Sequence, residues 1–218
     1  NDASEAKLQN IKNYDATIEI YGKDCVDSEM KAREVAHQNE QVYVSPYNDP
    51  AVVAGQGTIG YEINNQCDGL DVIIVSVGGG GLIGGTASYL KSVRPSLHVI
   101  GCSPENSAVM IHSMKKGEIL DLESIPTLSD GTAGGVEKDS ITFSICKDII
   151  DQTFLLSEQE IQNGMLKFIE NERMLLEGAA GTAVATLIKM KDELKGKKVG
   201  VVICGGNISL DVLNKILK

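Results

Sequence analysis

The chain has 218 residues, of which 42% are hydrophobic, and its formal net charge is -10 at pH 7. This length suffices for one large α/β domain, or for one domain together with part of another. The negative charge argues against nucleic acid or an anionic membrane as a partner. The five cysteines show no short spacing, which argues against a disulfide framework or a zinc site and favours a reducing, cytoplasmic compartment.

The first part of the chain, residues 1–46, has the pattern of a small α/β unit. Helical patterns and apolar, β-branched runs alternate there, in the order helix Ser4–Asn13, strand Ala16–Tyr21, helix Cys25–Asn39 and strand Val42–Ser45. The chain opens on Asn1 rather than methionine, with no strand before the first helix. We therefore expect that an N-terminal part is missing, and that residues 1–46 are the remainder of a small domain.

Residues 47–218 are predicted to form a larger, cofactor-binding domain with the same alternation. Its expected strands are Val72–Val77, His98–Cys102, Thr153–Leu156 and Val199–Cys204. Its expected helices are Pro50–Cys67, Leu82–Val93, Ser107–Lys116, Ser140–Ile149, Ser157–Glu172, Ala180–Leu194 and Leu210–Leu217. Near-continuous apolar strands separated by helices indicate an α/β fold, with a parallel sheet covered by helices on both faces.

Four consecutive glycines, Gly78–Gly81, stand between the strand Val72–Val77 and the helix that follows it. Glycines remove every side chain from the turn, so backbone N–H groups can converge on an anion, and the helix adds the positive end of its dipole. This arrangement predicts a phosphate cup.

Two nucleotide-binding loops and a purely structural turn are the alternatives for this glycine run. The spacing Gly79-x-Gly81-x-x-Gly84 satisfies the dinucleotide fingerprint, but no carboxylate ends the next strand, at Cys102-Ser103, to bind a ribose. No Lys-Ser or Lys-Thr follows the glycines, which excludes a Walker loop. A turn needed only for packing would not require four glycines, because each carries an entropic cost. A compact phosphorylated cofactor fits best.

Two further segments are expected near the cup. A second apolar strand ends in Cys204-Gly-Gly-Asn207, and ligands bind at the carboxyl ends of parallel strands, so Cys204 and the glycines are predicted to face one crevice. The alternative for Cys204 is a small buried residue that ends a strand. Glu177, between Leu-Leu and Gly-Ala-Ala, is predicted to be half buried and to have a partner.

Several motifs occur in one order along the chain and resemble those of a known family. They are Asp49-Pro-Ala-Val-Val-Ala-Gly-Gln-Gly-Thr58, Ser76-Val-Gly-Gly-Gly-Gly-Leu82, Pro104-Glu-Asn-Ser107, Thr127-Leu-Ser-Asp-Gly-Thr-Ala-Gly-Gly-Val-Glu137 and Cys204-Gly-Gly-Asn207. Together they resemble the pyridoxal-phosphate-dependent serine/threonine dehydratase family, which includes the serine racemases and has the tryptophan-synthase-β-like fold. The resemblance implies fold type II: two α/β domains with parallel twisted sheets, the N-terminal part missing here.

The resemblance also implies roles for individual residues around pyridoxal 5'-phosphate. In the family's pattern, Gly78, Gly79, Gly80, Gly81 and Leu82 match the loop that binds the phosphate. Cys204 matches the residue that faces the pyridine nitrogen, and Gly206 and Asn207 match the turn beside it. Glu177 matches an acidic residue near the ring, and Tyr47 matches a group at the ring edge. In the glycine loop, aspartate at Gly80 is expected to abolish cofactor binding while the fold survives.

Two features of the family have no counterpart in this sequence. The family's Schiff-base lysine and its Ser-Gly-Asn-His substrate loop belong to an N-terminal motif that is absent, so no catalytic residue is assigned and the fragment alone is predicted to be inactive. Ser103 and Val109 occupy the places where many relatives bind a divalent cation, so no metal is expected.

The reaction implied for the complete protein is β-elimination of a small β-hydroxy amino acid, such as L-threonine or L-serine, to a 2-keto acid and ammonia. Two alternatives are a serine racemase-like racemase and a non-catalytic protein that binds pyridoxal phosphate or a nucleotide. The resemblance further implies a homodimer, and the net charge of -10 gives the expectation that neither nucleic acid nor a membrane is a partner.

Overall fold

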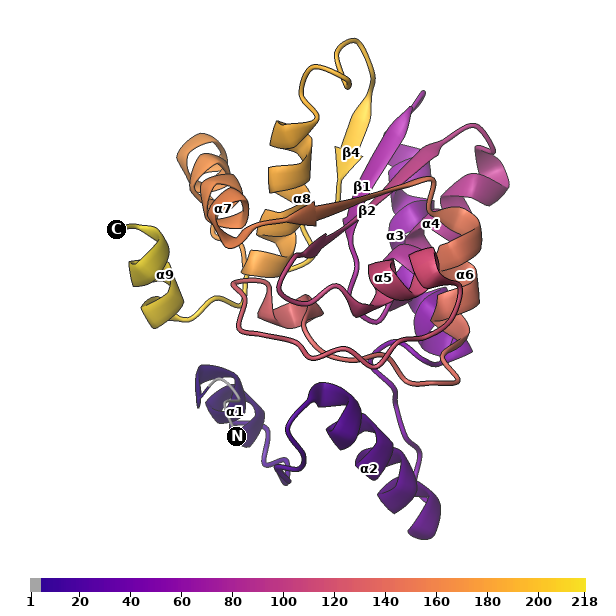
Figure 1. The fold of residues 1–218 in the computed structure, drawn as a ribbon, viewed down its shortest axis with the longest axis vertical. Coiled ribbons are helices and arrows are strands. Elements are labelled where there is room, and N and C mark those ends of the chain that lie inside the picture. The colour runs from indigo at the N-terminus through magenta and orange to yellow at the C-terminus, as the bar shows by residue number, and fades with distance from the viewer. Residues whose placement is uncertain (1–4) are drawn as a thin grey trace.

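The structure, a computed structural model, describes residues 5–218, and the predicted start of the first helix at Ser4 lies outside them. Helices and strands alternate through most of the chain (Figure 1). The elements are α1 (Glu5–Lys12), α2 (Cys25–Gln38), α3 (Pro50–Gln66), β1 (Val72–Ser76), α4 (Gly81–Val93), β2 (His98–Pro104), α5 (Val109–Lys116), the 3-10 turn η1 (Asp130–Thr132), α6 (Ile141–Ile149), β3 (Gln152–Leu156), α7 (Glu158–Glu172), α8 (Gly178–Lys189), β4 (Val199–Val201) and α9 (Leu210–Ile216). The α/β prediction is confirmed.

The four strands form one parallel sheet in the order β3-β2-β1-β4. In the register, Val72 pairs with His98 on one side and with Val199 on the other, so β1 is central. The parallel arrangement is the one that the strand–helix alternation predicts. The last strand is shorter than predicted, because regular pairing with β1 ends at Val201 and the chain continues without secondary structure toward Cys204.

Two hydrophobic clusters pack against the two faces of the sheet. Successive side chains of β1 point to opposite faces, so Ile73 and Val75 pack on the side of α4, while Val72 and Ile74 pack on the side of α7 and α8. Figure 1 shows α3 and α4 on one side of the sheet and α7 and α8 on the other. Both faces are therefore covered, as expected.

Local capping signals fix where two of these helices begin. Asp49 caps α3, because its carboxylate accepts hydrogen bonds from the backbone N–H groups of Ala51 and Val52, at 2.7 and 3.4 Å. Ser157 and Glu160 form a capping box at the start of α7: the Ser157 hydroxyl accepts from the N–H of Glu160, and the Glu160 carboxylate accepts from the N–H of Ser157. Both signals lie within four residues of the helix start and are therefore readable from the sequence.

Residues 5–46 contain two helices but none of the predicted strands. Ala16–Tyr21 and Val42–Ser45 have no strand structure, and both predictions are wrong. Val42 and Val44 are 90% and 72% exposed, so β-branched residues are present without a neighbouring strand to pair with. A strand depends on cross-strand hydrogen bonds and side-chain pairs, which the described chain does not offer here.

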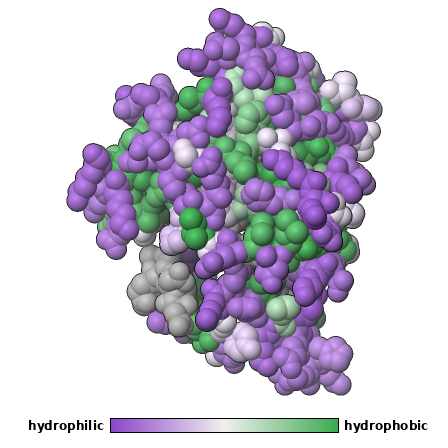
Figure 2. Space-filling model, viewed as in Figure 1, coloured by the Kyte–Doolittle hydropathy of each residue, from purple (hydrophilic) through white to green (hydrophobic). Residues whose placement is uncertain are grey.

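Hydrophilic residues cover most of the face in Figure 2, interrupted by apolar patches between the elements. Within residues 5–218, no helix combines the length and apolar character needed to cross a membrane.

Candidate active site

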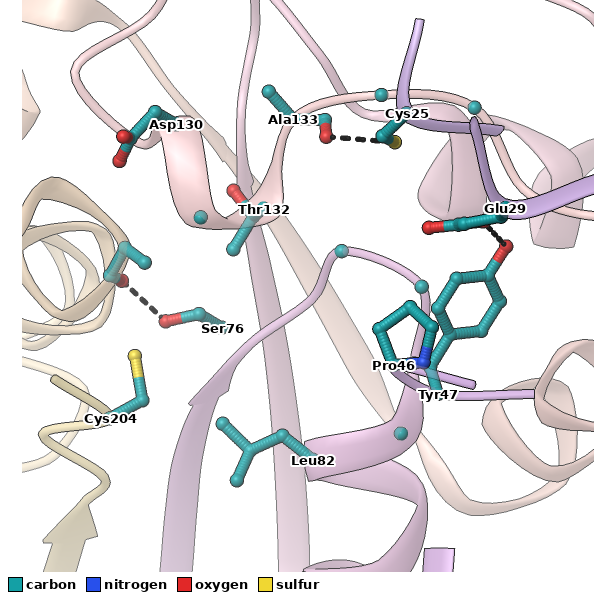
Figure 3. A pocket seen from close by; sticks show the side chains of 18 of the residues that line it. Cys25, Glu29, Pro46, Tyr47, Ser76, Leu82, Asp130, Thr132, Ala133 and Cys204 are labelled. Atoms are coloured by element: carbon teal, nitrogen blue, oxygen red, sulfur yellow. Dashed lines mark hydrogen bonds between the residues drawn. The ribbon is translucent and has the colours of Figure 1, made fainter. Parts of the chain in front are cut away.

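A cavity of about 430 Å³ lies at the carboxyl ends of the strands (Figure 3). It brings together the glycine turn after β1, the loop around η1, the start of α2 and the segment that follows β4. The lining residues are Cys25, Glu29, Pro46, Tyr47, Gln56, Ser76, Gly78, Gly79, Gly80, Gly81, Leu82, Asp130, Gly131, Thr132, Ala133, Gly134, Gly135, Glu177, Ala179 and Cys204. Ligands bind at this end of open parallel sheets.

The glycine turn has no room for side chains. A Cβ atom at Gly78 would lie 2.9 Å from Cα of Thr132 and 3.0 Å from its carbonyl oxygen. A Cβ at Gly79 would overlap the ring of Tyr47. The loop around η1 and the tyrosine ring therefore approach the turn as closely as its backbone allows.

The backbone donors of this turn are available to a ligand. Between Gly78 and Ile83 in the described chain, no acceptor is present for the backbone N–H groups, and Gly80, the N-cap of α4, makes no side-chain capping bond. Helix N-termini with unpaired N–H groups bind phosphate and other anions. The turn thus has the geometry of an anion cup.

Gly80 plays a different part from its neighbours. Its φ of +87° lies in the left-handed region, and a Cβ there would point into the core, 2.7 Å from Sγ of Cys146 and 3.1 Å from Cβ of Thr142. An aspartate at Gly80 would therefore disrupt the packing beneath the cup. That the fold survives this substitution stays a prediction, although the aspartate would have to displace these side chains.

Tyr47 connects the glycine turn to α2. Its hydroxyl donates a hydrogen bond to Oε2 of Glu29, at 3.0 Å, and accepts one from the backbone N–H of Glu137, at 2.9 Å. Burial and the nearby carboxylates raise the pKa of Tyr47, so it stays protonated. The tyrosine is 6% exposed and forms part of the cavity wall beside Gly79.

Glu137 anchors this connection. Its buried carboxylate accepts two hydrogen bonds from Nη2 of Arg33, at 3.1 and 2.8 Å, and one from Nδ2 of Asn48, at 2.9 Å. Arg33 lies on α2, so the ion pair attaches that helix to the larger part of the molecule. Charge-assisted hydrogen bonds of this kind are among the stronger polar contacts.

Cys204, Ser76 and Glu177 line the opposite side of the cavity. Figure 3 shows the sulfur of Cys204 near Ser76, whose hydroxyl donates to the carbonyl of Ala179 at 2.6 Å. Cys204 is exposed as a residue, but partial desolvation of its sulfur and the nearby Glu177 carboxylate raise the pKa of the thiol, so it is neutral at pH 7. Glu177 is half buried, as predicted, but among the described residues its carboxylate has no hydrogen-bond partner.

The structure brings most of the predicted site residues together. Gly78–Gly81, Leu82, Tyr47, Glu177 and Cys204 all line the one cavity. Gly206 does not line it, and Asn207 lines a neighbouring cavity instead; both residues are exposed.

Sequence reasoning gave no role to the loop Asp130–Gly135 or to Glu29, which also line the cavity. The three glycines within that six-residue loop, Gly131, Gly134 and Gly135, were a visible signal. The sequence around Glu29 carries no such signal, because its position in the cavity wall depends on how α2 packs against the rest of the chain.

Two absences concern the chemistry of the site. No lysine lines the cavity in the part of the chain that the structure describes. Among residues 5–218, no group of three His, Cys, Asp or Glu side chains could hold a metal ion. The hydroxyl of Ser103, at one of the two places considered for a cation, donates to the carbonyl of Val77 at 2.7 Å. That no metal binds stays a prediction.

Comparison with known proteins decides the family. Residues 1–205 match the family described as pyridoxal-phosphate dependent enzyme. The chain belongs to this family. An L-threonine ammonia-lyase of Thermotoga maritima is 37% identical over 212 residues, which cover 97% of this chain and 52% of that protein. The chain thus spans about half the length of this relative.

Solved structures agree on the fold. The processed form of threonine deaminase isoform 2 from Solanum lycopersicum superposes with a TM-score of 0.87, at 28% identity, over 99% of this chain and 63% of that one. The serine racemase of Dictyostelium discoideum gives a TM-score of 0.82, at 33% identity, over 96% of this chain and 67% of that one. The fold is therefore that of the fold type II enzymes, and the chain groups with the serine/threonine dehydratases.

Pyridoxal phosphate is the cofactor of this family, and the residues present fit it. The phosphate needs an anion cup, and the turn from Gly78 to Ile83 offers unpaired N–H groups without side chains. On the opposite wall, Cys204 presents a neutral thiol that can form a hydrogen bond with a ligand.

Proposed function

We propose that the full-length protein carrying this chain is a pyridoxal-phosphate-dependent ammonia-lyase. Its substrate is a β-hydroxy amino acid such as L-threonine or L-serine, and its products are a 2-keto acid and ammonia. The observation that carries the proposal is the side-chain-free anion cup at Gly78–Gly81, facing Cys204 across one cavity at the end of a parallel sheet.

Each wall of the cavity has a separate task in this proposal. The N–H groups of the glycine turn bind the cofactor phosphate, and the dipole of α4 adds to the attraction. Tyr47 packs at the ring edge, and Glu177 lies near the ring with Cys204. When bound, pyridoxal phosphate accepts the electrons left at Cα after the α-proton is removed. A neutral Cys204 thiol accepts or donates a hydrogen bond at the ring nitrogen, but it does not stabilise a positive charge there as a carboxylate would.

The lysine that attaches the cofactor is expected in the rest of the longer protein. This agrees with the absence of lysine from the cavity walls that the structure describes. Residues 1–218 alone are therefore predicted to convert no L-threonine. Release of 2-oxobutanoate by the isolated chain at an enzymatic rate would contradict this prediction.

The test uses the full-length protein, with L-threonine and L-serine as substrates. Keto-acid release should require pyridoxal phosphate and should be lost in Gly78→Ala, because the new Cβ would collide with the backbone of Thr132. Cofactor affinity should fall by at least about tenfold, which corresponds to about 1.4 kcal/mol. Gly55→Ala is the matched control, because a Cβ at Gly55 has no neighbour within 4 Å. Full activity in Gly78→Ala would refute the assignment of the cup.

Racemisation is the second candidate, supported by the likeness to the serine racemase structure. It begins with the same loss of the α-proton but ends with reprotonation on the other face. Chiral separation of the amino acid left after incubation with L-serine distinguishes the two: D-serine in excess of pyruvate would favour a racemase. Cofactor binding without either product would favour a non-catalytic binding protein.

Three further features belong to the proposal. An apolar groove of about 530 Å³ between α3, α4 and α6, lined by residues such as Val53, Tyr61 and Ile145, supports a homodimer, which light scattering of the purified protein tests. All five cysteines are free, which supports a cytoplasmic location.

The proposed domain division lies near Tyr47, with residues 1–46 as part of a small domain and residues 47–218 as the cofactor-binding domain. It is supported by the segments 16–21 and 42–45, which have no strand structure, whereas all four strands lie after Tyr47 in the described chain.

A further inference from the structure

The cavity that is proposed to hold cofactor and substrate has an unusual charge distribution. Three carboxylates line it, those of Glu29, Asp130 and Glu177, whereas the described lining contains no lysine, arginine or histidine. Asp130 is paired with Lys7, whose Nζ lies 2.8 Å away. Glu177 lies beside Cys204, on the wall assigned to the cofactor ring. Glu29 is thus the carboxylate on the opposite wall.

Packing holds Glu29 in place and leaves one of its oxygens open. Tyr47 donates to Oε2 at 3.0 Å, and no other hydrogen bond to this carboxylate exists among residues 5–218. Figure 3 shows the second oxygen turned away from Tyr47, toward the interior of the cavity. The helix that carries Glu29 is fixed at its N-terminus by Asp24, which accepts a hydrogen bond from the N–H of Gly135 at 2.8 Å.

The surroundings of Glu29 raise its pKa, but they leave the carboxylate ionised at neutral pH. Burial raises its pKa to about 6; Glu137 and Asp24 add to the rise, and the Tyr47 hydroxyl and Arg33 oppose it. Cys25, which also lines the cavity, has its pKa raised to about 12 and stays neutral. Glu29 is therefore ionised above about pH 7 and mostly protonated at about pH 5.

We propose that Glu29 is a specificity-determining residue that rejects amino acids with an anionic side chain. A negative charge on the substrate's side chain, in addition to its α-carboxylate, would enter a cavity into which the open oxygen of Glu29 faces and whose described lining contains no cation. The site is thereby restricted to β-hydroxy amino acids with neutral side chains, such as serine and threonine, and excludes hydroxyaspartate. The inference rests on the proposed function, because it assigns the substrate to this cavity.

L-Asparagine and L-aspartate provide the test, because they have nearly the same shape and differ by one charge. Their dissociation constants are measured by calorimetry on the full-length, cofactor-loaded protein at about pH 8. We expect the wild type to prefer the amide by about tenfold or more, and Glu29→Gln to reduce this preference to less than about threefold. Glu34→Gln, on the exposed side of α2 and paired only with Lys31 and Gln38, should leave it unchanged. An unchanged preference in Glu29→Gln would overturn the proposal.

A second measurement needs no variant. In the wild type, the preference for the amide should shrink as the pH falls through about 6, because Glu29 takes up a proton while the side chain of aspartate, with a pKa of about 3.9, remains ionised. A preference that is constant between about pH 8 and pH 5 would contradict the proposal.

L-Threonine turnover in the same preparation separates the two hypotheses. If threonine is not converted but the preference depends on Glu29, the proposed reaction fails and the role of Glu29 stands. If threonine is converted and the preference does not depend on Glu29, only the specificity proposal fails.

Discussion

The two parts of the chain differ in what their apolar residues pack against. In residues 47–218, Ile73, Ile74 and Val75 of β1 are fully buried between neighbouring strands and covering helices. In residues 5–46, Val42 is 90% exposed and Ile20 is 61% exposed. Valine and isoleucine favour strands in both parts, but they form one only where a partner strand is present. The comparison shows that β-propensity is a property of the environment as much as of the residue.

The contacts between the two parts are largely polar. Lys7 reaches Asp130, Arg33 reaches Glu137, and Glu29 reaches Tyr47. Such contacts are directional, so they set the position of α2 without burying much apolar surface. Because these contacts position α2, they also place the carboxylate of Glu29 in the cavity wall.

Hydrogen exchange should show the largest difference between the two parts. The amides of residues 16–21 and 42–45 have no backbone acceptor in the described chain, whereas those of β1 pair with β2 and β4. We expect β1 to exchange at least about a thousandfold more slowly, because its exchange requires opening of the core. Protection of residues 16–21 and 42–45 comparable to that of β1 would show that their amides form backbone hydrogen bonds in solution.

Truncation of apolar side chains should separate the two parts next. Ile100→Ala removes a side chain that is fully buried in the sheet and should lower the free energy of unfolding by about 2–5 kcal/mol. Val42→Ala removes an exposed one and should change it by less than about 0.5 kcal/mol. Urea denaturation of both variants measures the difference. Equal losses would mean that Val42 is buried in solution.

Loss of the ion pair at Glu137 tests the attachment of α2. Arg33→Ala leaves the buried Glu137 carboxylate with Asn48 as its only side-chain donor among residues 5–218. It also removes a contact with the ring of Tyr43, whose centre lies 4.7 Å from the guanidinium carbon. We expect a cost of about 1–2 kcal/mol, seen as faster amide exchange in α2. Lys31→Ala, which removes an exposed pair with Glu34 and a contact with the ring of Tyr21, is the control and should have a much smaller effect. Equal effects of the two variants would argue against a special role for Glu137.

The smallest expected effect is the pH dependence due to Glu29. Its pKa is higher in the folded protein, about 6, than in an unfolded chain, so its charged form is disfavoured by folding. The group therefore favours folding most at low pH, and this contribution is lost as the pH rises through about 6. Glu29→Gln should raise the stability of the protein above about pH 7 by less than about 1 kcal/mol and have little effect near pH 4.5. Thermal unfolding of both proteins across this range measures it; a variant that is less stable at pH 8 would reverse the sign.

Local features of this chain followed from its sequence alone. The caps at Asp49 and Ser157 lie beside the helices they begin, and the glycine run directly follows the strand it ends. The parallel sheet also followed, because strands buried on both faces have a continuous apolar pattern. Each of these signals depends on residues within one turn or one strand, so no distant contact was needed to read it.

Only the tertiary structure decided the features that depend on distant partners. The segments Ala16–Tyr21 and Val42–Ser45 have the composition of strands but no neighbour among the described residues, and Glu29 carries no local mark of a cavity residue. Gly80 reads like the other glycines, yet its Cβ position faces Cys146, 66 residues away in the chain. Strand pairing and the lining of a cavity are set by which elements meet in space, and a short stretch of sequence does not contain that information.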